Sequence, residues 1–327
     1  SMLSRVGSSI YWMARYVERA ENLARFIDVT LNVLLDHASG EQWEPLVRAT
    51  GDEVYFEKHY GPFTSENVRH FLTFDRDYPN SILSSVSMAR ENARTVREAI
   101  SSEAWETLNE FYLYVKNAAA TGVTSANSDF YTGVKKFSHL FGGIFDSTMS
   151  RDKGWHFANI GRYLERADKI SRILDVKYFT LLPSVASIGT TVDDLLWSSV
   201  LRSVSGFEMF RKQYHTITIH RIVDFLILNT RFPRAIRYCI RTTGDSLNQV
   251  GGPERGGNKA LRLVAEIEER LANTNNEIII NGGLHEFIDA LQISLNDLGT
   301  AINDTYFSRR RTLANTRMTQ SQISLSR

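Results

Sequence analysis

Two segments of the chain, 147 positions apart, repeat the same arginine and glutamate residues at the same spacing. The first segment covers 14–29 and the second covers 161–176. They agree, in order, at Arg, Tyr, Glu, Arg, Ala, Arg, Asp and Val. Because most of the shared residues are charged, the repeat preserves more than the apolar face of a helix. Guanidinium and carboxylate groups at fixed spacing suit bidentate pairing with each other or with an anionic ligand.

At 100° per residue, the polar residues of each segment fall within one arc of a helix, and the apolar stripe lies on the other side. These polar residues are Arg15, Glu18, Asn22 and Arg25 in the first segment and Arg162, Glu165, Lys169 and Arg172 in the second. A solvated face requires only charge of either sign, and its i, i+4 pairs contribute about 0.2–0.5 kcal/mol each. The repeated pattern therefore indicates specific partners, either ion pairs between helices or a bound anion.

Arg90, Arg94 and Arg97 repeat at i, i+4 and i+7, which predicts three guanidinium groups on one face of a third helix. Aligned arginines repel one another unless anions lie beside them. Those anions are either Glu18 and Glu165, which makes the cluster structural, or a carboxylate or phosphate of a ligand. The sequence leaves both interpretations open.

A further anion site is predicted at 229–234, where Pro233 suits the first turn of a helix and lies between Arg231 and Arg234. Glu18 and Glu165 are also candidates for a general base if the protein is an enzyme. The whole predicted ligand-binding set is Arg15, Glu18, Asn22, Arg25, Arg90, Glu91, Asn92, Arg94, Arg97, Arg162, Glu165, Arg166, Arg172, Arg231 and Arg234. We expect no metal and no cofactor, since neither long helix carries the Glu-x-x-His motif of di-metal bundles.

Composition excludes several classes of protein. The 38 basic and 37 acidic residues nearly balance, so there is no overall field of the kind that attracts nucleic acid or a membrane surface. Cys239 is the only cysteine, which excludes an intramolecular disulfide and suits a reducing compartment. No signal peptide or run of about 20 apolar residues is apparent, and we expect a cytoplasmic protein.

Apolar residues recur at three- and four-residue spacing, with only 6 Pro and 20 Gly to interrupt them. This pattern predicts an all-α fold, a multi-helix antiparallel bundle with an internal duplication of a long charged helix. The repeat helices are expected over about 8–37 and 153–181. Ala14 and Gly161 are small enough to allow a neighbouring backbone to approach. We expect one domain over 2–308 and a basic, flexible tail over 309–327.

Over nearly its whole length the chain resembles the bacterial alpha-E domain family, which is named for a glutamate-bearing helix. The motifs that carry this resemblance are 11–25, 89–94, Trp105 with Asn109, 148–149 with 151–152, 161–173 and 232–234. The chain departs from the family's pattern at Arg231 and at Ala235, where such sequences often have serine. This second departure weakens any role for a hydroxyl group there.

The resemblance implies a helical domain that occurs beside, or fused to, circularly permuted ATP-grasp enzymes and transglutaminase-like peptidases, which make or trim amide bonds. The leading hypothesis is an accessory protein, not catalytic on its own, that acts with such an ATP-grasp ligase and binds a carboxylate- or phosphate-bearing ligand through its Arg/Glu cluster. One alternative is a scaffold in which that cluster is an internal ion-pair lattice. Another is an enzyme acting on a peptide-like substrate.

Overall fold

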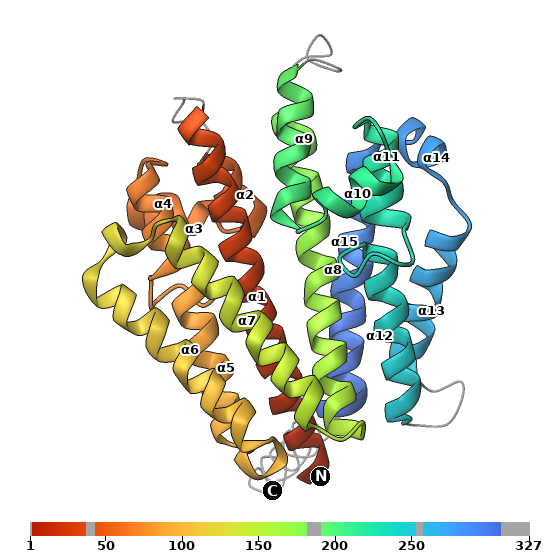
Figure 1. Ribbon diagram of the computed structural model, residues 1–327. Helices are drawn as coiled ribbons and strands as arrows, with labels where there is room; N and C mark the ends of the chain where they lie inside the picture. Colours follow the sequence, from red (N-terminus) through yellow and green to blue (C-terminus); the bar gives the residue numbers. More distant parts are fainter. Residues whose placement is uncertain (1, 37–42, 182–190, 253–257, 309–327) are drawn as a thin grey trace, which may run out of the picture.

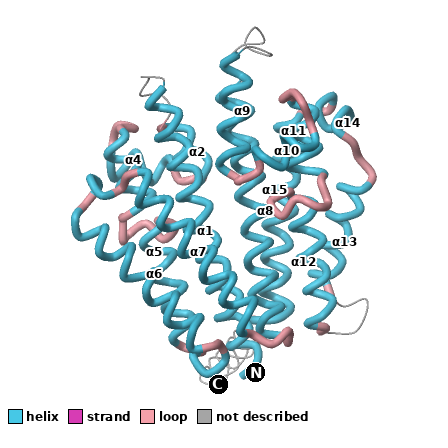
Figure 2. Tube along the Cα trace, viewed as in Figure 1, coloured by secondary structure: helices cyan, strands magenta, loops and turns pink. Residues whose placement is uncertain are grey.

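Helices make up most of the described chain (Figure 1, Figure 2). The computed structural model describes residues 2–36, 43–181, 191–252 and 258–308. No strand occurs in these ranges, which confirms the prediction of an all-α fold. None of the helices in the same ranges is both long and apolar enough to cross a membrane. The tail predicted over 309–327 lies outside the described residues.

The two repeat segments lie on the two longest helices, α1 (Met2–Asp36) and α8 (Lys153–Leu181). The bounds of α8 are those predicted, whereas α1 begins six residues earlier than expected. Gly7, which falls in this additional stretch, lies against another helix: an added Cβ there would come within 3.0 Å of the Phe157 ring. The small residue therefore has a packing role inside the helix.

α1 and α8 run parallel and approach each other closely. Their contacts advance in the same direction along both helices, from Gly7 with Phe157 to Tyr11 with Gly161. An added Cβ on Gly161 would lie 2.4 Å from the carbonyl oxygen of Tyr11, so only glycine fits there. The expected role of Gly161 in close backbone approach is confirmed. The antiparallel arrangement expected of the bundle therefore does not hold for this central pair.

The duplication extends from one helix to a unit of four. α5 and α7 pack against α1 as α12 and α15 pack against α8, while α6 contacts α5 and α7 as α13 contacts α12 and α15. The bounds are α5 (Ile82–Arg94), α6 (Ser102–Thr121), α7 (Ser128–Thr148), α12 (Ile236–Val250), α13 (Lys259–Ala272) and α15 (Leu284–Ile302). Each half thus packs two helices against its own long helix and a third helix against those two, and the two long helices meet at the centre (Figure 1).

Short helices complete the two halves. In the first half they are α2 (Glu44–Thr50), α3 (Glu53–Tyr60) and α4 (Ser65–Thr73), with 3₁₀ turns at Arg97–Ala99 and Val123–Ser125. In the second half they are α9 (Thr191–Ser203), α10 (Phe207–Gln213), α11 (Ile219–Val223) and α14 (Asn276–Asn281), with π turns at Asp224–Leu228 and Asn303–Phe307. Figure 1 shows α2 to α4 on one side of the central pair and α10, α11 and α14 on the other.

The core includes both faces of α1. The apolar stripe of that helix is buried, as its spacing predicts, at Ile10, Met13, Val17, Ala20, Ala24 and Ile27. The polar stripe is buried as well: Glu18 is 3% exposed, Asn22 1% and Arg25 4%. Ionised groups this far from water require paired charges. The charged face is therefore not a solvated one.

Candidate functional site

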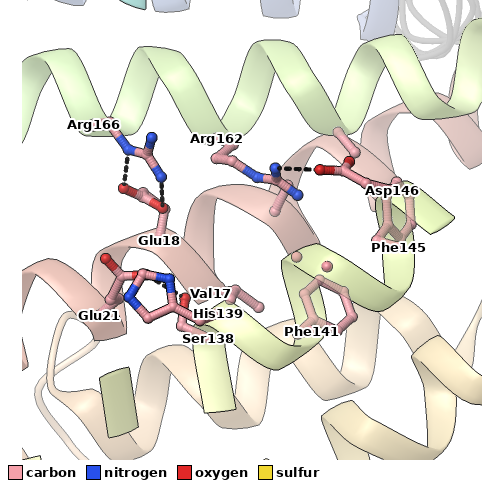
Figure 3. A pocket seen from close by; sticks show the side chains of 14 residues that line it. Val17, Glu18, Glu21, Ser138, His139, Phe141, Phe145, Asp146, Arg162 and Arg166 are labelled. Atoms are coloured by element: carbon pink, nitrogen blue, oxygen red, sulfur yellow. Dashed lines mark hydrogen bonds and ion pairs between the residues drawn. The ribbon is translucent and has the colours of Figure 1, made fainter. Parts of the chain in front are cut away.

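The two Glu-Arg dipeptides of the repeat bind each other across the contact between α1 and α8. Arg19 Nε donates to Glu165 Oε1 over 2.8 Å, and its Nη2 donates to Oε2 over 3.3 Å. In the equivalent contact, Arg166 Nε donates to Glu18 Oε1 over 2.7 Å and its Nη2 to Oε2 over 3.3 Å (Figure 3). Because the helices are parallel, each one supplies the glutamate that holds the other's arginine.

Three cations surround the carboxylate of Glu165, which is completely buried. Besides Arg19, Arg15 Nε donates to Oε2 over 2.9 Å, and Lys169 Nζ lies 3.5 Å from Oε1. Burial alone would raise the pKa of Glu165, but Arg19, Lys169 and Arg15 together hold this pKa well below its usual range. The carboxylate is therefore ionised at neutral pH and depends on these neighbours for its solvation.

The carboxylate of Glu18 has a different set of partners. Asn22 Nδ2 donates to Glu18 Oε1 over 3.2 Å, and Arg234 Nη1 lies 3.4 Å from the same oxygen. Arg234 also pairs with Glu21 through Nη2. Arg234 belongs to the segment before α12, so this contact joins the central pair to the second half of the fold.

Glu21 extends the cluster towards α7 and α9. Its Oε2 accepts from Arg25 Nε over 2.9 Å, and its Oε1 accepts from the Ser138 hydroxyl over 2.7 Å. Arg25 Nη1 then donates to the Ser203 carbonyl over 2.9 Å, and Nη2 lies 3.0 Å from His139 Nε2. Since a guanidinium group can only donate, His139 accepts through Nε2 and is neutral. Burial lowers the pKa of His139 accordingly.

These contacts form two groups, one around Glu165 and one around Glu18 and Glu21, and we call the two groups together the ion-pair lattice. Its members are Arg15, Glu18, Arg19, Glu21, Arg25, Glu165, Arg166, Lys169 and Arg234.

The two repeat segments differ most in the contacts of Arg15 and of its counterpart Arg162. Arg15 is held by Glu165 through two of its nitrogens, at 2.9 and 2.8 Å. Arg162 makes one hydrogen bond to the described residues, and this contact with Asp146 Oδ2 is 3.5 Å long. The carboxylate equivalent to Glu165 is already occupied by the arginines at 166 and 234. Arg162 is therefore left outside the lattice.

Arg162 lines a cavity of about 170 Å³ between α1, α7 and α8, which we call the α7 pocket (Figure 3). Figure 3 shows Arg166 with Glu18 at one end and Arg162 with Asp146 at the other. An added Cβ on Gly142 would lie 3.4 Å from Arg162 Nη2, so the glycine gives the guanidinium room on α7. The remaining walls include Glu21, Ser138, His139, Phe141, Gly143 and Phe145.

A second cavity, of about 210 Å³, lies between α1, α2 and α8, and we call it the α2 pocket. Arg172 crosses one side of it, where Nε donates to Asp168 Oδ2 over 3.1 Å and Nη1 donates to the Ala49 carbonyl over 3.2 Å. Its other charged lining residues are Arg15, Arg19, Asp168 and Lys169. The predicted polar arcs of the two repeat helices thus border two separate pockets.

The residues predicted to present arginines to the buried glutamates lie elsewhere. α5 ends at Arg94, so Arg97 falls in the following 3₁₀ turn and the expected single helix face does not form. Arg90 Nε donates over 2.7 Å to an asparagine of α6, Arg97 stacks on the α6 tryptophan, and Arg94 pairs with Glu91. Asn92 donates to a carbonyl within α5. The structural interpretation, in which these arginines neutralise Glu18 and Glu165, is wrong.

The predicted anion-binding helix start at 229–234 is also wrong. α12 begins at Ile236, so Pro233 precedes the helix instead of occupying its first turn. Arg234 is 5% exposed and points to the glutamates of α1. Arg231 is exposed, and its backbone N–H donates to Asn229 Oδ1 over 2.7 Å. The arginine nearest the helix belongs to the lattice.

The structure does not favour Glu165 as a general base. Such a base needs a raised pKa and access to a cleft, whereas Glu165 is buried with a lowered pKa. Burial raises the pKa of Cys239 to about 12, so its thiol is not a nucleophile at neutral pH. The described residues contain no group of three His, Cys, Asp or Glu side chains that could hold a metal.

Sequence analysis missed Arg19, Glu21 and Asp168 as members of the site. Arg19 lies about 100° from Glu18 around α1, outside the predicted arc, and it contributes because the partner helix is parallel and adjacent. The signal that identifies it is the Glu-Arg dipeptide itself, present at both repeat positions.

The Alpha-E family model, described as a predicted alpha-helical domain with a conserved ER motif, matches residues 2–307. Glu18-Arg19 and Glu165-Arg166 are Glu-Arg dipeptides of this kind. Uncharacterized proteins of Mycobacterium bovis and of two Mycobacterium tuberculosis strains are each 22% identical over 329 residues. Each alignment covers 92% of this chain and 36% of the relative, so the chain spans little more than a third of their length. No solved structure matches the chain.

Proposed function

The chain belongs to the Alpha-E family of helical domains, and we propose that it binds a small carboxylate- or phosphate-bearing molecule in the α7 pocket. Arg162 is the group that holds the anion. The observation that carries this proposal is the single 3.5 Å hydrogen bond of Arg162 within the described residues, at the wall of a cavity. A guanidinium group has five N–H donors in a planar fork. Most of these donors are available to a bidentate anion.

The charge around the α7 pocket supports an anionic ligand. Four guanidinium groups, from Arg25, Arg162, Arg166 and Arg234, border or approach the pocket together with three carboxylates, from Glu18, Glu21 and Asp146. One positive charge is left over, in a site where Arg162 is only 17% exposed. Attraction to an anion is stronger there than in open water. The aromatic walls formed by two phenylalanines suit an apolar portion of the same ligand.

The ion-pair lattice holds this pocket in shape. Glu18 and Arg166 form one of its walls and are fixed by charge-assisted hydrogen bonds of 2.7 and 3.3 Å. Groups that are locked by their own partners bind a ligand with less loss of entropy. In this proposal the lattice is structural and Arg162 is the part that recognises the ligand.

The reciprocal pairing of the two Glu-Arg dipeptides favours a second candidate function, a scaffold for protein interaction in which the lattice sets the register of α1 and α8. Such a protein needs no small ligand. The two candidates differ in what they require of Arg162: the scaffold does not need it, whereas the ligand-binding protein does.

We further propose that the chain acts as an accessory to a circularly permuted ATP-grasp ligase, with a transglutaminase-like protein as a second partner, in the cytoplasm. The resemblance described above supports these partners. A second support is the length of the mycobacterial relatives, in which the matching region makes up 36% of the chain and therefore has extensive further sequence beside it. A ligase that forms amide bonds uses carboxylate substrates and acyl phosphates. Carboxylate and phosphate are also the groups that we propose the α7 pocket binds.

Isothermal titration calorimetry with succinate, N-acetylglutamate and inorganic phosphate tests the ligand-binding proposal. We expect saturable binding of at least one probe to the wild-type chain and at least about tenfold weaker binding to Arg162→Met, as the loss of a charged hydrogen bond predicts. Arg90→Met, which removes an arginine from outside both pockets, is the matched control. Equal binding by wild type and Arg162→Met would refute the proposal, and no binding of any probe would favour the scaffold.

A further inference from the structure

We infer that the α2 pocket is a second ligand site, and that it takes a small phosphate monoester in its dianionic form. This inference does not rest on the proposed function, because Arg162 takes no part in the α2 pocket. It rests on three observations: the excess of cations over carboxylates in the pocket, the N–H donors that these cations leave unused, and the position of the cations on two different helices.

Cations outnumber carboxylates in the α2 pocket. Arg15 and Arg19 come from α1, and Lys169 and Arg172 come from α8. Within the described part of the chain, these cations form ion pairs with two carboxylates, those of Glu165 and Asp168. Two positive charges are therefore left over. A phosphate monoester carries about −1.5 to −2 at pH 7, which matches that excess.

The same cations retain free donors. Arg172 Nη2 has no hydrogen bond to the described residues, and the contacts of Lys169 Nζ with Asp168 and Glu165 are long, at 3.3 and 3.5 Å. Both side chains are partly exposed, at 25% for Arg172 and 22% for Lys169, so they reach the pocket's opening. A phosphate group offers three acceptor oxygens to donors of this kind.

Two helices present these cations from different directions, since Arg19 is anchored on α1 and Lys169 on α8. Arg19 is held in place by Asn80, whose Oδ1 accepts from Nη1 over 2.8 Å. A flat carboxylate presents its oxygens in one plane, whereas the oxygens of a tetrahedral phosphate point in several directions. A phosphodiester carries a single negative charge, so it would compensate only one of the two excess positive charges. The pocket therefore suits a phosphate monoester better than a nucleic-acid backbone.

Calorimetry of the full chain with glycerol 3-phosphate tests this inference, with dimethyl phosphate as the singly charged comparison. We expect the monoester to bind at least about tenfold more tightly than the diester, and Lys169→Met and Arg172→Met each to weaken monoester binding at least about tenfold. Lys135→Met is the matched control, because it removes a lysine paired with Asp28 over 2.9 Å outside both pockets. Circular dichroism confirms that each variant is folded.

Arg162→Met separates this site from the α7 pocket, and it should bind glycerol 3-phosphate as the wild type does. Four results would overturn the inference: no saturable binding to the wild type, equal binding of the diester, unchanged affinity in both the Lys169 and Arg172 variants, or a loss of affinity in Arg162→Met. The last result would assign the phosphate to the α7 pocket and leave the proposed function intact.

Discussion

Arg166 Nε lies 2.7 Å from Glu18 Oε1, so the arginine of the second Glu-Arg dipeptide binds the glutamate of the first. In the equivalent contact, the arginine of the first dipeptide, Arg19, binds the glutamate of the second, Glu165. Both contacts require that α1 and α8 be parallel and in one register. Buried ion pairs add little net stability compared with apolar packing, but removing one partner leaves an unpaired charge in the interior. The dipeptides therefore specify which way the two halves of the fold meet.

Replacing Glu165 by glutamine should destabilise the fold strongly. The change removes a fully buried negative charge and leaves Arg15, Arg19 and Lys169 without it. We expect the free energy of unfolding, measured by urea denaturation, to fall by about 3–5 kcal/mol. Glu91→Gln removes a glutamate from an exposed pair that water screens, and it should change the free energy of unfolding far less than Glu165→Gln does. Similar losses for the two variants would contradict the structural role of the lattice.

Equivalent arginines of the two repeats should differ in their effect on stability. Arg15→Met removes one hydrogen bond of 2.9 Å and an ion-pair contact of 2.8 Å to a buried carboxylate, and we expect a loss of about 2–3 kcal/mol. Arg162→Met removes one contact of 3.5 Å with a half-exposed aspartate and should cost less than about 1 kcal/mol. Thermal and urea denaturation of both variants measure this. Equal losses would show that Arg162 is part of the lattice after all.

Two glycines on helices should respond in opposite ways to alanine. Gly161→Ala places a Cβ 2.4 Å from the Tyr11 carbonyl oxygen, so α1 and α8 must separate, at a cost of about 1–3 kcal/mol. Gly143 lies in α7 with nothing within 4 Å of an added Cβ. Gly143→Ala should therefore stabilise the protein by about 0.5–1 kcal/mol through helix propensity. A stabilised Gly161→Ala protein would refute the close approach.

Stability should decline with acidification through His139. Burial lowers the pKa of His139 in the folded state below its ordinary value of 6.5, so the unfolded chain binds more protons once the pH falls to about that value. The contribution of His139 to the free energy of unfolding is then constant above pH 6.5 and falls as the pH drops below it. His139→Gln should remove this part of the slope between pH 7.5 and 5.5.

Two other histidines, His285 and His156, also contribute to the pH dependence of stability and must be separated from His139. The pKa of His285 is raised, chiefly by its hydrogen bond with Asp175, so its contribution is present below pH 6.5 and is lost as the pH rises through the raised pKa. The pKa of His156 is lowered by burial, as that of His139 is. The difference between wild type and His139→Gln isolates one residue from both. An identical slope in the two proteins would contradict a neutral His139 beside Arg25.

Much of the fold follows from sequence patterns. The apolar stripe of α1 and the position of Pro183 shortly after α8 predict two long helices, and the bounds of α8 are reproduced. The four-helix extent of the duplication was missed, although Tyr78-Pro79-Asn80 before α5 and Phe232-Pro233-Arg234 before α12 carry a signal for it. That signal is short, and a Pro flanked by an aromatic residue is common before helices.

The site was harder to predict, because periodicity gives the face of a helix but not the direction of its neighbour. The buried charges of α1 depend on a parallel partner, which local spacing does not specify. For the same reason Glu18 and Glu165 were considered, beside a ligand, as the anions for the arginines near α5, whereas Arg234, distant in the sequence, contacts Glu18. Which arginine stays outside the lattice, Arg162 or Arg15, depends on that one tertiary contact and has no local signal.

A double-mutant cycle on Glu18 and Arg166 tests the central claim most directly. The free energy of unfolding is measured for the wild type, Glu18→Gln, Arg166→Met and the double variant. Because the two side chains share a buried bidentate pair, we predict a coupling energy of about 1.5–3 kcal/mol, with the double variant much less destabilised than the sum of the single ones. Single effects that add to within about 0.5 kcal/mol would contradict the exchanged Glu-Arg pairs.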